Sequence, residues 1–276
     1  MESGKSKPMG KPLSRRNALG GMGAAMAMPL LGPSLPFSAR PVEGKVALVT
    51  GSGRNLGRAT VLELARRGAD VVVNARSNRE EAEAVAREAQ ALGVRAIALM
   101  ADVGDEQQVI RMVDEALERL GRIDILINNA GYRGNSSITE MTTDEWRAAA
   151  AVNFDAPFFC SRAVVPGMIA NSYGRIITVS GLNSFHGRPN WAHVCASKMG
   201  AVGMTRALAV ELGQHNILVN HVVPGAYVAH PNLDQIPLGR IGLAEELANM
   251  YAFLSSEDAS YITGQTFHVN GGEIRY

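Results

Sequence analysis

Short apolar runs, rich in β-branched residues, alternate with longer amphipathic stretches from Val42 onward. A near-continuous apolar run predicts a strand buried on both faces, and the amphipathic stretch after it predicts a helix that crosses over to the next parallel strand. The alternation therefore predicts an α/β fold with one doubly wound parallel sheet of about seven strands and helices on both faces. The expected strands are 46–50, 70–74, 96–101, 125–128, 175–180, 218–223 and 266–269, and clear helical stretches are 57–67, 80–92, 106–120 and 192–212.

The first forty residues differ from the rest of the chain. They hold six basic residues and one acidic residue, whereas the remaining 236 carry 21 basic and 25 acidic residues. Two adjacent arginines precede a charge-free run from Gly20 to Leu31 and then proline-rich sequence, which is the layout of an export signal and resembles a twin-arginine signal. We expect residues 1–40 to be an export signal or disordered segment and residues 41–276 to form one domain. The location is then periplasmic or otherwise exported; without a working signal it is cytoplasmic.

Composition excludes several classes of protein. Hydrophobic residues make up 46% of the chain and charged residues 19%, which is enough apolar material for a core. Two cysteines exclude a disulfide scaffold, and the histidines show no recurring ligand spacing, so no metal site is expected. The body has no long uncharged apolar run, and the net charge is +1. We therefore expect neither integral membrane contact nor a nucleic-acid partner.

A glycine-rich loop, Gly51 to Gly57, lies between the first expected strand and the first expected helix. Glycines let the backbone turn tightly and approach a pyrophosphate at the N-terminus of the helix. In an alternating α/β chain this placement is much more specific than a glycine pattern alone, and it predicts a Rossmann-like dinucleotide site. Asn55 tolerates a left-handed backbone better than most residues do, so the turn is expected to survive there.

Three further motifs follow in order: Asp102-Val103, Asn128-Asn129-Ala130-Gly131 and Pro224-Gly225. Together with the loop, they resemble the short-chain dehydrogenase/reductase family over about residues 42–276. The resemblance implies a nicotinamide cofactor, a small-molecule substrate and a homo-oligomer, either a dimer or a tetramer. For Asp102, an N-cap of the next helix is a compatible second role. The expected cofactor-binding residues are Gly51, Arg54, Asn55, Leu56, Gly57, Arg76, Asp102, Val103, Asn129, Ala130, Gly131, Lys198, Pro224 and Gly225.

The end of the second expected strand bears on the choice of cofactor. Proteins that prefer NAD place an acid there for the ribose 2′-hydroxyl, but this chain reads Asn74-Ala75-Arg76. The guanidinium groups of Arg54 and Arg76 are suited to a 2′-phosphate. The sequence therefore predicts that NADP(H) is preferred over NAD(H). The alternative is that both arginines are solvated surface residues.

The catalytic end departs from the family pattern. The family uses a Tyr, a Lys four residues later on the same helix face, a Ser at the end of the preceding strand and an Asn on a central helix. Lys198 and Asn153 match. An ungapped alignment from Lys198 places Val194 at the Tyr and Gly181 at the Ser. We therefore expect an atypical active site with a non-standard proton donor.

A one-residue shift offers an alternative alignment that recovers Ser180 and places His193 in the position of the Tyr. His193 is five residues from Lys198, about 140° around a helix, so it reaches the pocket only if the helix starts late or its first turn is distorted. The segment between Pro224-Gly225 and Pro237 is short, which predicts a pocket that is open or covered by another subunit. The catalytic candidates are Lys198, Asn153, His193 and Ser180, with His186, His230, Tyr132 and Tyr227 as weaker ones.

Three functions fit these observations. The leading hypothesis is an NADP(H)-dependent oxidoreductase, because the nicotinamide carries the hydride chemistry and the protein supplies position and a proton. The alternatives are a non-redox enzyme of isomerase or lyase type on the same scaffold, and a catalytically silent NADP-binding or assembly protein. The fold alone does not choose among them.

Overall fold

The computed structural model describes residues 41–227 and 232–274, which belong to one compact unit, Ser38–Tyr276. The expected export signal, residues 1–40, and the candidate His230 lie outside the described residues. The short segment expected after Pro224-Gly225 is described only in part, because residues 228–231 are also outside.

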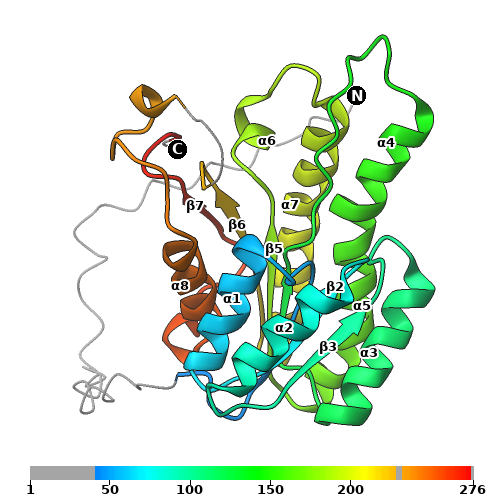
Figure 1. Ribbon diagram of the computed structural model, residues 1–276, viewed down its shortest axis with the longest axis vertical. Helices are drawn as coiled ribbons and strands as arrows, with labels where there is room; N and C mark the ends of the chain where they lie inside the picture. The colour runs from blue at the N-terminus through cyan, green and yellow to red at the C-terminus, as the bar shows by residue number, and fades with distance from the viewer. Residues whose placement is uncertain (1–40, 228–231, 275–276) are drawn as a thin grey trace, which may run out of the picture. The chain divides into compact units, whose positions relative to one another are not determined.

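Seven strands form one sheet in the order β3-β2-β1-β4-β5-β6-β7, and every neighbouring pair is parallel, which confirms the predicted fold class (Figure 1). The chain runs outward from β1 to β3 and then returns to β4 on the other side of β1. In such a sheet, ligands bind at the carboxyl ends of the strands beside this reversal. The strands are β1 Val46–Val49, β2 Asp70–Ala75, β3 Ala96–Met100, β4 Ile125–Asn128, β5 Gly174–Val179, β6 Ile217–Pro224 and β7 Thr266–Val269.

The helices α2, α3 and α4 begin at side-chain caps. The Asn78 side chain accepts a hydrogen bond at the start of α2, and Thr142 and Glu145 form a capping box at the start of α4. Asp105, not Asp102, caps α3, so the expected capping role of Asp102 was wrong. The helices are α1 Asn55–Arg66, α2 Arg79–Gln90, α3 Glu106–Leu120, α4 Thr143–Ala150, α5 Ala156–Ala170, α6 Asn183–His186, α7 Ala192–Leu212 and α8 Ala244–Leu254, with a π-helix Ala151–Asp155 and 3₁₀ turns Gly213–His215, Leu233–Gln235 and Glu257–Ala259.

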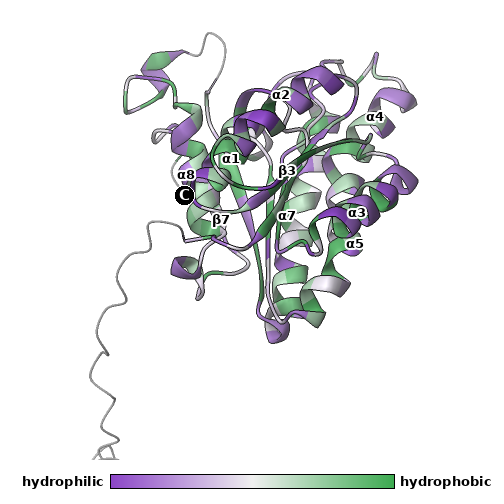
Figure 2. Cartoon of the chain, turned by 60° about the horizontal axis from the view of Figure 1, so that its bottom comes forward, coloured by the Kyte–Doolittle hydropathy of each residue, from purple (hydrophilic) through white to green (hydrophobic). Residues whose placement is uncertain are grey.

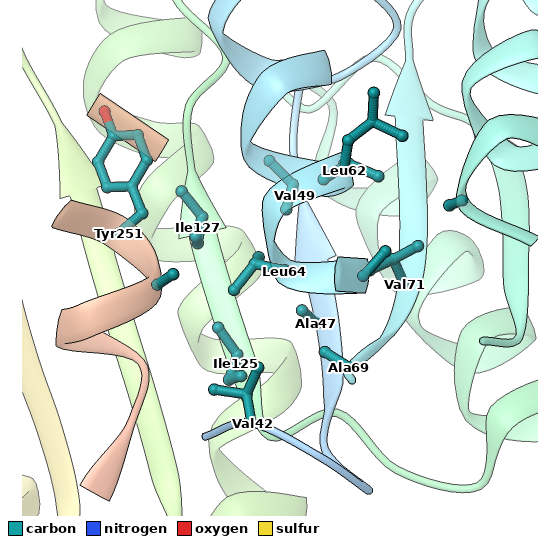
Figure 3. Packing of buried hydrophobic residues seen from close by; sticks show 14 of the residues in the cluster. Val42, Ala47, Val49, Leu62, Leu64, Ala69, Val71, Ile125, Ile127 and Tyr251 are labelled. Atoms are coloured by element: carbon teal, nitrogen blue, oxygen red, sulfur yellow. The ribbon is translucent and has the colours of Figure 1, made fainter. Parts of the chain in front are cut away.

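Two apolar layers cover the sheet. On one face, strand residues such as Val71 and Ile127 pack against α1, α2 and α8, where the Tyr251 ring is fully buried (Figure 3). On the other face, Leu126 and Val219 pack against α3, α5 and α7. Apolar residues concentrate on the strands, and polar residues lie on the outer surfaces of α2 and α3 (Figure 2). This sandwich holds the carboxyl ends of the strands rigidly, and the candidate site lies there.

Candidate functional site

The glycine loop between β1 and α1 depends on glycines at two positions. Gly51 has φ +60°, and a Cβ on it would lie 2.9 Å from the Cα of Ala130. A Cβ on Gly57 would lie 2.6 Å from the carbonyl oxygen of Gly51. Both distances are shorter than real Cβ contacts, so the backbone approaches closely only because these side chains are absent. Asn55 has φ +50°, a left-handed conformation that asparagine was expected to tolerate at this turn.

Buried polar side chains fasten this loop to its neighbours. Asn74, at 1% exposure, accepts from the Gly51 N–H at 3.0 Å and donates to the carbonyls of Leu99 and Ala101. The Thr50 hydroxyl accepts from the N–H groups of Asn129 and Ala130, both at 3.0 Å. The roles of Asn74 and Thr50 are not predictable from the sequence, because their partners come from other strands. The loop is therefore held open beside β4 and β2.

The first turn of α1 keeps its backbone N–H groups available. Its N-cap residue, Arg54, makes no capping hydrogen bond with its side chain. Uncapped N–H groups at the N-terminus of a helix form an anion site, and here they lie beside the tight turn that Gly51 and Gly57 permit. The residues present therefore fit a dinucleotide.

Arg54 lies at the end of the loop between β1 and α1, Arg76 directly follows β2, and both are exposed. Within the described part of the chain, neither side chain makes an ion pair or a hydrogen bond, whereas the nearby Arg58 pairs with Glu88 and Arg79 with Glu83. The Asp102 carboxylate accepts from the Gly104 N–H at 3.0 Å, and Val103 is buried. After β6, Gly225 donates to the Val269 carbonyl at 3.0 Å, which fixes the turn after Pro224.

Lys198, Asn153 and Gly131 come together at the carboxyl ends of β4 and β5. The position of a Cβ on Gly131 would lie 3.5 Å from Nζ of Lys198 and 3.6 Å from Oδ1 of Asn153. The Lys198 amine donates to the carbonyls of Val179 and Ser180 at 3.3 and 3.4 Å. These contacts place the amine beneath the loop that the family resemblance assigns to the cofactor.

Asn153 lies in the π-helix between α4 and α5, which inserts an extra residue and turns its side chain inward. Its Oδ1 accepts from the Tyr132 N–H at 2.9 Å, and its Nδ2 donates to the Tyr132 carbonyl at 3.1 Å and to the Ser197 hydroxyl at 3.2 Å. One amide thus holds the loop after β4 against α7.

Burial, together with the smaller effect of the positive charge of Arg133, lowers the pKa of Lys198 to about 7. The Lys198 side chain is 7% exposed, and no carboxylate among the described residues hydrogen-bonds to it. Burial beside Lys198 and His268 also lowers the pKa of His221, on β6, to about 3, so this imidazole is neutral at pH 7. The amine is therefore able to lose and regain a proton near neutral pH.

This lowered pKa makes the stability of the apo-protein depend on pH. Between pH 7 and about 10 the unfolded chain binds more protons at Lys198 than the folded chain, so raising the pH stabilises the fold through this group. Lys198→Met removes the effect. We expect the free energy of unfolding of the wild type to rise relative to Lys198→Met by at most about 1.4 kcal/mol per pH unit over this window. Urea denaturation at pH 7, 8 and 9 measures it, and parallel pH profiles would contradict it.

His193 faces a different neighbourhood. Helix α7 begins at Ala192 and runs to Leu212, so the late start or distorted first turn that His193 needs to share the face of Lys198 is not observed. The imidazole is 2% exposed and lies edge-on to the Tyr132 ring, with centroids 6.1 Å apart. Its Nε2 and the Tyr132 hydroxyl both lie 2.7 Å from the Cβ position of Gly134.

The positions expected to carry the family's Tyr and Ser lack acidic protons. Val194, one turn before Lys198, is fully buried. A Cβ on Gly181 would meet no described atom within 4 Å, so open space lies beside it. The Ser180 hydroxyl is buried and has no partner among the described residues, and its carbonyl accepts from Lys198.

Two of the weaker catalytic candidates, His186 and Tyr227, contact residues outside the group around Lys198. His186 is exposed on α6 and contacts Oδ1 of Asn183 at 3.2 Å. The Tyr227 hydroxyl donates to the Val269 carbonyl at 3.1 Å, and burial raises the pKa of this phenol to about 12. In the ranges 41–227 and 232–274, no three His, Cys, Asp or Glu side chains are grouped to hold a metal. No helix in those ranges has the length and apolarity required to cross a membrane.

The sheet order, the glycine cradle and the open helix N-terminus define a dinucleotide-binding α/β protein. A sequence profile of the family described as short chain dehydrogenase matches residues 45–234. The chain belongs to this family, and its relatives are oxidoreductases. A 3-oxoacyl-[acyl-carrier-protein] reductase FabG of Staphylococcus aureus strain Mu50 is 39% identical over 239 residues, covering 83% of this chain and 97% of that protein.

Two further relatives agree with this assignment. The 3-oxoacyl-[acyl-carrier-protein] reductase of Synechocystis is 38% identical over 241 residues, which is 84% of this chain and 98% of that protein. Among solved structures, a gluconate 5-dehydrogenase from Burkholderia cenocepacia J2315, in complex with NADP and tartrate, matches with a TM-score of 0.80 and 32% identity. That match covers 85% of this chain and 97% of the dehydrogenase.

Proposed function

We propose that this protein is an NADP(H)-dependent oxidoreductase that reduces a small carbonyl, imine or activated-alkene substrate without a phenol on α7. The observation that carries the proposal is the pairing of a glycine cradle with Lys198 and Asn153 at the same edge of the sheet. Bound reduced nicotinamide would supply the hydride. Gly51, Gly57 and the first turn of α1 would hold the pyrophosphate, and the loop 129–131 with Lys198 would hold the nicotinamide ribose.

The test is purified protein with NADPH and a substrate panel. The names of the reductase relatives make a 3-oxoacyl thioester the first substrate to try. Cyclic imines and α,β-unsaturated ketones follow, because they need a weaker protein acid than ketones do. We expect loss of the nicotinamide absorbance with at least one class. Turnover of a substrate with unchanged NADPH would instead support the isomerase or lyase alternative.

The preference for NADP(H) is tested by binding. We expect NADPH to bind at least about tenfold more tightly than NADH, because hydrogen bonds between ions contribute about 1.5–3 kcal/mol each. Arg54→Ser with Arg76→Ser should remove most of that preference. Arg79→Ser is the matched control, since this exposed arginine already pairs with Glu83. Fluorescence titration measures the dissociation constants; equal values for NADPH and NADH in the wild type would contradict the proposal.

A homo-oligomer, a dimer or a tetramer, is also proposed. Phe154, Phe158 and Met199 leave 39–43% of their surface exposed on the π-helix, α5 and α7. Exposed large apolar side chains on adjacent elements favour burial against another copy. Export through the paired arginines remains a proposal that rests on residues 1–40.

A further inference from the structure

We infer that Lys198 is itself the proton donor of the reaction: its ammonium group protonates the substrate atom that receives negative charge. This inference rests on the proposed function, since it names the acid that an oxidoreductase without the α7 phenol requires. The family resemblance implies that Lys198 binds the cofactor, whereas the acid of the family is the Tyr that this helix lacks.

The other residues at the catalytic positions around the amine have no proton to donate. Val194, Gly181 and Asn153 occupy the other catalytic positions, and none of them has a proton that titrates. Tyr132 and His193 do have such protons, but their rings pack together against Gly134. Of the residues at the family's catalytic positions, Lys198 is therefore the one that can donate a proton.

The hydrogen bonds of the Lys198 amine leave one of its N–H groups available. An ammonium has three N–H donors, and Lys198 uses two of them on the carbonyls of Val179 and Ser180 at the end of β5. Both contacts exceed 3.2 Å, so the amine is loosely held. Among the described residues no third acceptor is found. The third N–H remains for a substrate atom or one bridging water beneath Gly131, which is itself exposed.

The charges around Lys198 favour the neutral form of its amine. The charged group that acts on the amine is the Arg133 guanidinium from the loop after β4. The imidazole of His221 on β6, whose pKa the amine helps to lower, is neutral at pH 7. Neither neutralises an ammonium, and burial also disfavours the charged form. These conditions bring the pKa of Lys198 to about 7, where a group donates and recovers a proton efficiently.

A bound reduced nicotinamide would supply the hydride for the new C–H bond, and the electron pair of the C=O or C=N bond would move to oxygen or nitrogen. That atom takes one proton from Nζ of Lys198, which leaves a neutral amine. Solvent returns the proton before the next turnover.

The test first measures the titration of the Lys198 amine by NMR and then the rate of the reaction. The chain has five lysines, Lys5, Lys7, Lys11, Lys45 and Lys198, so NMR of the full chain labelled with 13C at lysine Cε gives few signals. Lys198→Arg assigns the Lys198 signal by its disappearance. We expect this signal to titrate near pH 7 without cofactor, and the other four lysines are internal references. A midpoint in the ordinary lysine range, about 10, would overturn the inference.

Kinetics then separate donation from binding. Arginine keeps the charge but stays protonated, so Lys198→Arg should lower kcat at pH 7 at least about 100-fold while the NADPH dissociation constant changes less than about fivefold. In the wild type, kcat for reduction should fall as pH rises above 7. The inference would be overturned if Lys198→Arg retained its activity. It would also be overturned if Lys198→Arg were active while His193→Gln or Tyr132→Phe lost activity 100-fold. If no substrate consumes NADPH, the proposed function fails, whereas the NMR titration still decides the state of the amine.

Discussion

Gly57→Ala will weaken NADPH binding by more than about 100-fold. The new Cβ would lie 2.6 Å from the Gly51 carbonyl oxygen and 2.7 Å from Cα of Ser52, so backbone atoms, not a flexible side chain, must move. The movement displaces the first turn of α1, whose N–H groups are expected to bind the pyrophosphate. Fluorescence titration with NADPH measures the loss.

Gly53→Ala is the control from the same loop. A Cβ there would lie 3.5 Å from Cβ of Ala75, an ordinary van der Waals contact. We expect NADPH binding within about threefold of the wild type, since nothing has to shift. Circular dichroism of both variants separates loss of the loop from loss of the fold. Equal binding by Gly57→Ala and Gly53→Ala would show that the close approach at Gly57 is not needed.

Val194→Tyr with Gly181→Ser will create ordinary ketone reduction, with a gain of about 10²–10⁴ in kcat/KM for a 3-oxoacyl thioester. A phenol at position 194 lies four residues before Lys198 and shares its helix face, so the ammonium lowers its pKa. The space beside Gly181 admits a serine hydroxyl without a clash. Initial rates of NADPH oxidation measure the gain.

Val194 is fully buried, so the larger ring introduces crowding, which the phenylalanine variant reproduces without the hydroxyl. Val194→Phe with Gly181→Ser is therefore the matched control and should show no gain. If the tyrosine and phenylalanine variants have the same rates, Val194 does not occupy the position of the family's acid.

The strands were predictable because their cause is local. Ile125–Asn128 and Thr266–Val269 were predicted to the residue, and α3 and α7 have the expected bounds. Apolar periodicity is read from neighbouring residues, and the burial that it reflects follows from the layered sheet. The left-handed backbone at Asn55 was predictable for the same reason, since few residue types accept it.

The site was less predictable, because its parts meet through tertiary contacts. Asn153 was identified by motif, yet its bonds to the backbone of Tyr132 span 21 residues and depend on a π-helix that no local pattern signals. From the sequence, Asn74 indicates only that the acid typical of NAD-binding proteins is absent. In the structure its side chain also ties the glycine loop to β3. The surroundings of His193 follow only from its tertiary contact with the Tyr132 ring, which no local pattern signals.

The amide of Asn153 has a mechanical consequence. It satisfies both backbone polar groups of Tyr132 and one hydroxyl on α7, so a segment without regular secondary structure is braced as firmly as a strand. The loop after β4 and the helix that carries the amine are therefore joined through one side chain. The Tyr132 ring adds a second contact to the same helix at His193.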